Sequence, residues 1–237
     1  MARSIVITGG GTGIGREIAA WFRQEGDDVV IIGRRAEVLE KAAAELDVTP
    51  LACDVSDPAA LEDALASLPA RIDVLVNAAG GNVHRDADGL AGLAAGWNAN
   101  YTANVLTAVL TTSALNERLA AGGTVVQIGS IAAERGPTGS YGAAKAALHR
   151  WNMQLARELG ERDVTANVIS CGYIEATDFF GDGMTEARRA AYVEETAVKR
   201  PGTPADVAAV AFFLASPGAR HITGQVIDLN GGAWTKR

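Results

Sequence analysis

Residues 4–15 read Ser-Ile-Val-Ile-Thr-Gly-Gly-Gly-Thr-Gly-Ile-Gly, and this stretch decides the fold. Its β-branched run predicts a short strand, and the segment after the glycines, which carries Ile18, Trp21 and Phe22, predicts an amphipathic helix. Glycine adopts the backbone angles of a tight strand-to-helix turn, and its missing side chain lets an anion approach the helix N-terminus. We therefore predict a phosphate-binding turn between a first strand and a first helix.

The rest of the chain repeats this alternation of short β-branched runs and longer stretches rich in Ala, Leu and Glu. We predict further strands at residues 29–32, 72–76, 124–128, 164–169 and 225–228. We predict helices at residues 14–25, 36–46, 58–67, 98–119, 141–160 and 204–215. Strands that are apolar throughout suit burial on both faces, and their alternation with helices favours parallel pairing. The expected fold is a single α/β domain over residues 1–237, a doubly wound parallel β-sheet flanked by helices on both faces.

The composition of the 237 residues disfavours several function classes. The net charge is −7 and no basic run exceeds two arginines, so we expect no binding to nucleic acid. No apolar run approaches the roughly 20 residues of a bilayer span and no export signal is recognisable, so we expect a cytoplasmic protein without a membrane partner. Cys53, Cys171, His84, His149 and His221 show no metal-ligand spacing, so we expect reduced thiols and no metal.

The end of the second predicted strand reads Gly33-Arg34-Arg35. In a dinucleotide-binding sheet this position adjoins the adenosine ribose, where a carboxylate would accept hydrogen bonds from the 2′-hydroxyl. A guanidinium pairs instead with a 2′-phosphate. Arg34, and to a lesser degree Arg35, therefore favours NADP(H) over NAD(H). The alternative is that both arginines only begin a solvated helix.

Several motifs, in their order along the chain, resemble those of the short-chain dehydrogenase/reductase family. They are Thr8-Gly9-x-x-x-Gly13-x-Gly15, Asp54-Val55, Asn77-Ala78-Ala79-Gly80 and Tyr141-x-x-x-Lys145. Asn104, Ser130, Tyr141 and Lys145 stand where this family keeps its catalytic tetrad. The likeness runs from Arg3 to Gly232 and implies a Rossmann fold with hydride transfer to or from a nicotinamide cofactor.

The spacing of Tyr141 and Lys145 places a phenol and an ammonium on one face of a helix. A nearby cation favours the phenolate, so we expect Lys145 to lower the pKa of Tyr141 and make it an acid/base group. Ser130 follows a predicted strand and would hold the substrate oxygen at the carboxyl edge of the sheet. The resemblance adds that Lys145 grips the nicotinamide ribose and that Asn104 holds a water in a proton relay.

The cofactor contacts expected from the turn, the strand ends and the resemblance form one larger set. They are Gly9, Thr12, Gly13, Ile14, Gly15, Arg34, Arg35, Asp54, Val55, Asn77, Ala78, Gly80, Tyr141, Lys145, Gly172, Ile174 and Thr177. Two features depart from the family pattern: Ser130 and Tyr141 are closer in sequence than usual, and Cys171-Gly172 replaces Pro-Gly. Cys171 is either a small buried residue or an oxidisable thiol near the site.

Residues 175–201 interrupt the alternation with a polar, glycine-broken and partly helical stretch that we interpret as a mobile cover over the substrate. Apolar side chains flank or lie on it, namely Tyr173, Phe179, Phe180, Met184 and Tyr192. They either line a substrate pocket or form the underside of a lid packed on the sheet.

The leading hypothesis is an NADP(H)-dependent enzyme that interconverts a small or medium ketone and its secondary alcohol. One alternative is reduction of 3-oxoacyl groups on an acyl carrier protein, which needs a basic docking surface near the site. The uncharged turn at residues 119–123 argues against such a surface, whereas Arg118, Arg135 and Arg162 could still supply one. Another is a non-catalytic regulator that senses NADP(H). By resemblance, the helices at 98–119 and 141–160 pair between subunits in a homo-oligomer, either a tetramer or a dimer.

Overall fold

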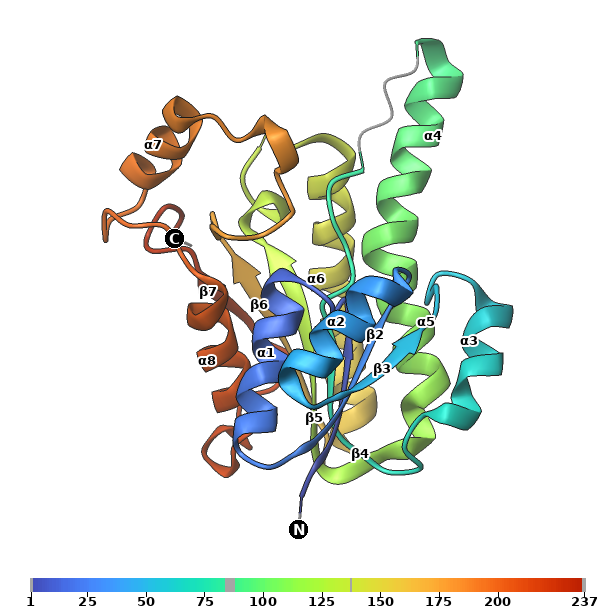
Figure 1. Cartoon of the computed structure of the whole chain (residues 1–237). Helices are drawn as coiled ribbons and strands as arrows, with labels where there is room; N and C mark the ends of the chain where they lie inside the picture. The colour runs from blue at the N-terminus through green and yellow to red at the C-terminus, as the bar shows by residue number, and fades with distance from the viewer. Residues whose placement is uncertain (1, 84–87, 137, 236–237) are drawn as a thin grey trace.

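A computed structural model describes residues 2–83, 88–136 and 138–235, and its centre is a seven-stranded parallel sheet (Figure 1). The strand order is β3-β2-β1-β4-β5-β6-β7. The strands are β1 (Ser4–Thr8), β2 (Asp28–Gly33), β3 (Thr49–Ala52), β4 (Ile72–Asn77), β5 (Leu119–Ser130), β6 (Thr165–Cys171) and β7 (Val226–Leu229). Strand β1 pairs with β2 on one side and with β4 on the other, which creates the point where the winding reverses.

Helices cover both faces of this sheet. They are α1 (Gly13–Gln24), α2 (Ala36–Leu46), α3 (Pro58–Ala64), α4 (Gly89–Tyr101), α5 (Thr107–Leu115), α6 (Gly139–Gly160), α7 (Glu186–Glu195) and α8 (Pro204–Leu214). One core joins the sheet to α1, α2 and α8 around Phe22 and Ile31, and the other joins it to α3, α5 and α6 around Leu75 and Leu155. The predicted doubly wound α/β fold is confirmed.

Three predicted elements differ from the structure. The helix predicted at 98–119 is wrong in its bounds, because α4 begins at Gly89 and a π-helical turn (Thr102–Leu106) separates it from α5. Strand β3 was not predicted, because Thr-Pro-Leu-Ala has no β-branched run and its proline is tolerated only because β3 is an edge strand. Residues 119–123 are not a turn before β5 but its first part, where the register with β4 shifts.

Local signals fix where two of the helices begin. The Asp57 carboxylate accepts hydrogen bonds from the backbone of Ala59 and Ala60 at the start of α3. At the start of α8, Thr203 and Asp206 form a reciprocal capping box. Such caps typically contribute about 1 kcal/mol each.

The carboxyl ends of the strands all open at one edge of the sheet, between the α4 and α7 regions (Figure 1). Among the described residues, no helix is long and apolar enough to cross a bilayer, and no cluster of three His, Cys, Asp or Glu could hold a metal ion. His84 lies outside the described residues. This edge is where a doubly wound sheet places its ligand.

Candidate active site

A cavity of about 1110 Å³ follows the carboxyl edge of the sheet. Of the residues that the sequence predicted for the site, all but Asn77 and Asn104 line it. The wall runs from Arg34 and Asp54 past the glycine turn to Tyr141 and Lys145. Residues distant in sequence are thus brought together along one continuous space.

The glycine turn can be built only with glycine at two of its positions. Gly9 has φ +69°, and a Cβ there would lie 2.8 Å from the backbone of Ala78 after β4. A Cβ on Gly15 would lie 2.4 Å from the carbonyl oxygen of Gly9. The turn is held closed because the Gly9 amide donates to the Ile32 carbonyl at 2.8 Å. The result is a bare backbone cradle at the start of α1, which fits the pyrophosphate of a dinucleotide.

The end of the cavity beyond β2 carries opposite charges. Arg34 is exposed and, within the described residues, no carboxylate lies at ion-pair distance from it, whereas Arg35 lies 3.6 Å from Asp178. Burial alone would raise the pKa of Asp54, but hydrogen bonds from Ser56 and the positive charge of Arg34 outweigh it and lower that pKa. The Arg34 guanidinium is therefore accessible to a ligand at this end of the cavity, close to the ionised carboxylate of Asp54.

The opposite end brings together Ser130, Tyr141 and Lys145. Ser130 is the last residue of β5, and Tyr141 and Lys145 lie one turn apart on α6. Ser130 and Tyr141 line the same cavity, and the Ser130 hydroxyl acts on Tyr141 in the direction that lowers the pKa of its phenol. The Lys145 ammonium donates to the Ile128 carbonyl at 2.8 Å and lies 5.9 Å from the centroid of the Tyr141 ring. A proton donor, a second hydroxyl and a buried cation thus share one corner of the cavity.

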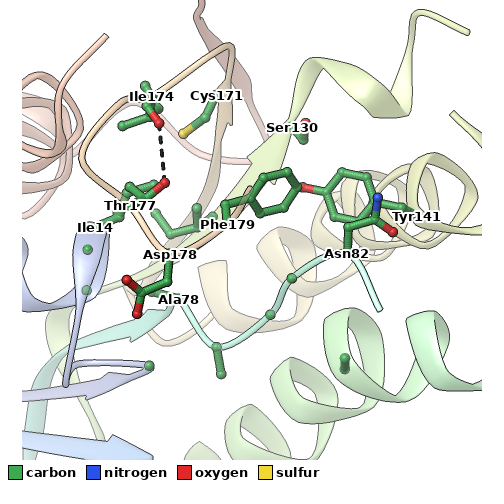
Figure 2. A pocket seen from close by; sticks show the side chains of 18 of the residues that line it. Ile14, Ala78, Asn82, Ser130, Tyr141, Cys171, Ile174, Thr177, Asp178 and Phe179 are labelled. Atoms are coloured by element: carbon green, nitrogen blue, oxygen red, sulfur yellow. Dashed lines mark hydrogen bonds between the residues drawn. The ribbon is translucent and has the colours of Figure 1, made fainter. Parts of the chain in front are cut away.

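Burial dominates the titration of this corner. It lowers the pKa of Lys145 to about 8 and raises the pKa of Tyr141. The expectation that Lys145 lowers the pKa of Tyr141 is therefore wrong for the protein alone. The reason is packing, since the Phe179 ring lies 5.3 Å from the Tyr141 ring and points toward it in Figure 2.

Asn104 lies behind the cavity wall and not in it. Its side-chain oxygen accepts from the Gly81 amide at 3.1 Å, and its side-chain nitrogen donates to the Gly81 carbonyl at 2.8 Å. A Cβ on Gly80 would lie 2.7 Å from this Asn104 oxygen and 3.4 Å from the Lys145 nitrogen, so both side chains adjoin the same stretch of backbone. Asn77 is also buried and donates to the Thr112 hydroxyl at 2.9 Å. Asn104 thus fixes backbone beside the site, whereas Asn77 links the end of β4 to a side chain of α5.

The segment after β6 forms the remaining wall. The Thr177 hydroxyl donates to the Ile174 carbonyl at 3.3 Å (Figure 2). A Cβ on Gly13 would lie 3.4 Å from the methyl group of Thr177, so Thr177 packs against the glycine turn. Four aromatic residues of this region line the cavity, which favours the pocket interpretation for Tyr173, Phe179, Phe180 and Tyr192, while Met184 does not line it. Cys171 also lines the cavity, but burial raises the pKa of its thiol to about 12, so it stays protonated and poorly reactive.

Sequence reasoning missed part of this wall. Arg188 and Glu195 on α7 line the cavity, as do Asn82 and Val83 after β4. Arg135 was considered only as part of a docking surface, yet it lines the cavity and pairs with Glu195 at 2.7 Å. Motif spacing gives no signal for such residues, because they meet only through the path of the segment after β6.

Comparison with known proteins identifies relatives over the whole chain. Residues 9–233 match a family model described as enoyl-(acyl carrier protein) reductase. An oxidoreductase of Mycobacterium tuberculosis is 35% identical over 233 residues, which cover 97% of each chain. A 7α-hydroxysteroid dehydrogenase complexed with NADH is 30% identical with a TM-score of 0.87, covering 97% of this chain and 93% of that one. A short-chain dehydrogenase of Burkholderia cenocepacia in complex with NADP is 31% identical with a TM-score of 0.86, covering 98% and 97%. The chain belongs to the short-chain dehydrogenase/reductase family and is an oxidoreductase with a Rossmann-like fold.

Proposed function

We propose that this protein reduces a ketone, or oxidises the corresponding secondary alcohol, with NADP(H) as cofactor and Tyr141 as the general acid and base. The observation that carries the proposal is the meeting of Ser130, Tyr141 and Lys145 in one corner of the cavity, which continues to the glycine cradle. The bound cofactor supplies or accepts the hydride at the carbonyl carbon. The chain's own residues then have to handle the oxygen and its proton.

In the reducing direction, Ser130 and Tyr141 hold the carbonyl oxygen, and Tyr141 gives its phenolic proton to that oxygen as negative charge develops there. The phenolate that remains is stabilised by the Lys145 ammonium. This ammonium is charged below about pH 8, the value to which burial lowers its pKa. Asn104 acts from behind by fixing Gly80 and Gly81, which adjoin Lys145. We assign it a positioning role on these contacts, which differs from the proton-relay role that the resemblance implies for this position.

The preference for NADP(H) rests on Arg34. Its guanidinium is exposed at the end of the cavity beyond β2, where a 2′-phosphate would accept hydrogen bonds from it. The two solved relatives named above hold NADH and NADP respectively, so membership of the family leaves the choice open. The other predicted cofactor contacts, Asn77 excepted, line the same cavity, which supports a cofactor-binding role for them.

The alternatives have weaker support. Docking of an acyl carrier protein needs cations near the cavity mouth, but Arg118 and Arg162 precede β5 and β6 at the opposite edge of the sheet and bind backbone carbonyls there. Arg135 is at the cavity but is paired with Glu195. A regulator that only senses NADP(H) would need the cradle but not the hydroxyl pair of Ser130 and Tyr141.

A homo-oligomer is the assembly that the helix surface supports. Leu90, Leu93, Trp97 and Tyr101 recur at helical spacing along α4 and are all exposed, Leu90 by 85%. Met153 on the neighbouring α6 is exposed as well. Association of two copies through this apolar face would bury it, and light scattering that returned the monomer mass of 24.5 kDa would contradict this.

The test compares the wild type with Tyr141→Phe. We measure oxidation of NADPH and of NADH with a panel of ketones, together with cofactor binding by fluorescence. The variant should lose turnover by at least about a hundredfold, the lower range for general acid catalysis, and keep its cofactor affinity. Tyr101→Phe, which changes an exposed tyrosine, is the control. Turnover retained in Tyr141→Phe would remove Tyr141 from the mechanism, and cofactor binding without turnover of any ketone would favour the sensing regulator.

A further inference from the structure

The cavity wall formed after β6 contains an arginine, Arg188, that differs from the other arginines of the wall in its ion pairing. Arg35 pairs with Asp178, and Arg135 pairs with Glu195. Arg188 also lines the cavity, yet within the described residues no carboxylate lies at ion-pair distance from it. Among the side chains that the structure describes, Arg188 is therefore a guanidinium at this end of the cavity without an acidic partner.

Contacts with neutral groups hold the Arg188 guanidinium in place. One nitrogen donates to the Gly183 carbonyl at 3.1 Å, and another donates to the Tyr192 hydroxyl at 3.3 Å. Its central carbon lies 5.2 Å from the Phe180 ring centroid and 5.6 Å from that of Tyr192. A guanidinium has five N–H donors, so donors remain for a ligand, while the stacked rings limit the orientations that it can adopt. The cation is thus partly preorganised.

An aromatic path links this cation to the proton donor. The Tyr141 and Phe179 rings lie 5.3 Å apart, and the Phe179 and Phe180 rings lie 4.8 Å apart. Arg188 stacks on the far side of the path, at Phe180. A ligand whose carbonyl reaches Tyr141 would therefore have an apolar wall beside its body and a positive charge beyond it.

We propose that Arg188 binds a carboxylate at the far end of the substrate, so that the substrate class is oxo acids, or the corresponding hydroxy acids, with an apolar body. This inference rests on the proposed function, because it assumes that the carbonyl reacts at Tyr141. A planar guanidinium and a carboxylate match through two parallel hydrogen bonds, which a neutral end group cannot form. Phe179 and Phe180 contact the body between the two ends, and Arg188 selects among substrates without taking part in proton transfer.

The experiment uses pairs of compounds that differ only in the terminal charge. The substrates are phenyl ketones whose alkyl chain ends in a carboxylate, in several chain lengths, each beside its primary amide. The binding probes are phenylalkanoates without a carbonyl, again beside their amides, titrated calorimetrically into the protein saturated with NADPH. The variants are Arg188→Met and Arg188→Lys. Arg189→Met is the control, because Arg189 lies on the same helix, pairs with Glu175 and does not line the cavity.

The wild type should prefer the best acid over its amide by about tenfold to a hundredfold in kcat/KM and in affinity, the range expected for one charge-assisted contact. Arg188→Met should remove this preference by lowering kcat/KM and affinity for the acids only. Arg188→Lys should keep part of the preference, and Arg189→Met should keep it in full. Added salt should reduce the preference, because Arg188 lies at an exposed rim.

Three results would overturn the inference. Equal use of acid and amide by the wild type would show that no carboxylate is recognised, while reduction of the ketones would leave the proposed function standing. An equal loss for acids and amides in Arg188→Met would show that Arg188 only packs on the rings. If no ketone is reduced with either cofactor, the proposed function fails and the substrate assignment fails with it, whatever the phenylalkanoates bind.

Discussion

Replacement of Lys145 by Met should make the protein more stable at neutral pH while abolishing its activity. Burial lowers the pKa of Lys145 from 10.5 to about 8, so below pH 8 the fold holds a charge that it disfavours. A shift of this size corresponds to about 3 kcal/mol. Loss of the hydrogen bond to the Ile128 carbonyl, 2.8 Å long, leaves that acceptor unpaired at a cost of about 1 kcal/mol. Lys145→Met should therefore raise the free energy of unfolding by about 2 kcal/mol at pH 7.

The gain should depend on pH in a defined direction. Between pH 8 and 10.5 the unfolded wild type binds more protons at Lys145 than the folded wild type, so wild-type stability rises with pH and the gain of the variant disappears. Urea unfolding followed by tryptophan fluorescence at pH 7 and pH 10 measures this, with Lys41→Met as an exposed control on α2. A variant that is less stable than the wild type by the same amount at both pH values would refute the reasoning. In that case the hydrogen bond and packing of Lys145 would outweigh its desolvation.

Three further substitutions test other parts of the site. Gly9→Ala should abolish NADPH binding because its Cβ would collide with the Ala78 backbone, whereas Gly26→Ala, also at positive φ but with open space around it, should keep binding in the same fluorescence titration. Arg34→Gln should weaken NADPH binding by about tenfold to a hundredfold and leave NADH binding nearly unchanged; equal losses would remove the 2′-phosphate role. Phe179→Ala should lower the pKa of Tyr141 by exposing it, so the limb of the pH–rate profile that reports Tyr141 should move to lower pH, and Phe180→Ala should move it less.

The sequence predicts the parts of this site that depend on local geometry. A strand followed by glycines and a helix leaves few alternatives for the turn at residues 8–15, and the spacing of Tyr141 and Lys145 puts them one helical turn apart in any context. Ser130 needs one further inference, that a strand end in a parallel sheet lies at the ligand-binding edge. In these cases the residues that determine the geometry are close together in sequence.

The parts that the sequence does not predict depend on distant packing. Burial raises the pKa of Tyr141, and Phe179, which packs on Tyr141, reaches it only through the path of the segment after β6. The π-helical turn that carries Asn104 interrupts a stretch with uniform helical character, so no breaker residue marks it. Arg188 belongs to no motif, and its character comes from the absence of an acidic partner among the described residues.

The segment after β6 forms one wall of the cavity, and its contacts with the body of the protein indicate how firmly it is held. Two ion pairs join it to the rest of the cavity wall, Arg35 with Asp178 at 3.6 Å and Arg135 with Glu195 at 2.7 Å. Pairs that are exposed to this extent contribute about 0–1 kcal/mol each, so together they oppose opening only weakly. The stronger restraint is apolar, since Phe179 buries part of its ring against Tyr141. A substrate with an apolar body can replace that contact with its own, and a 2′-phosphate can draw Arg35 away from Asp178. We therefore propose that opening of the segment is coupled to the two ligands through the same residues that would recognise them.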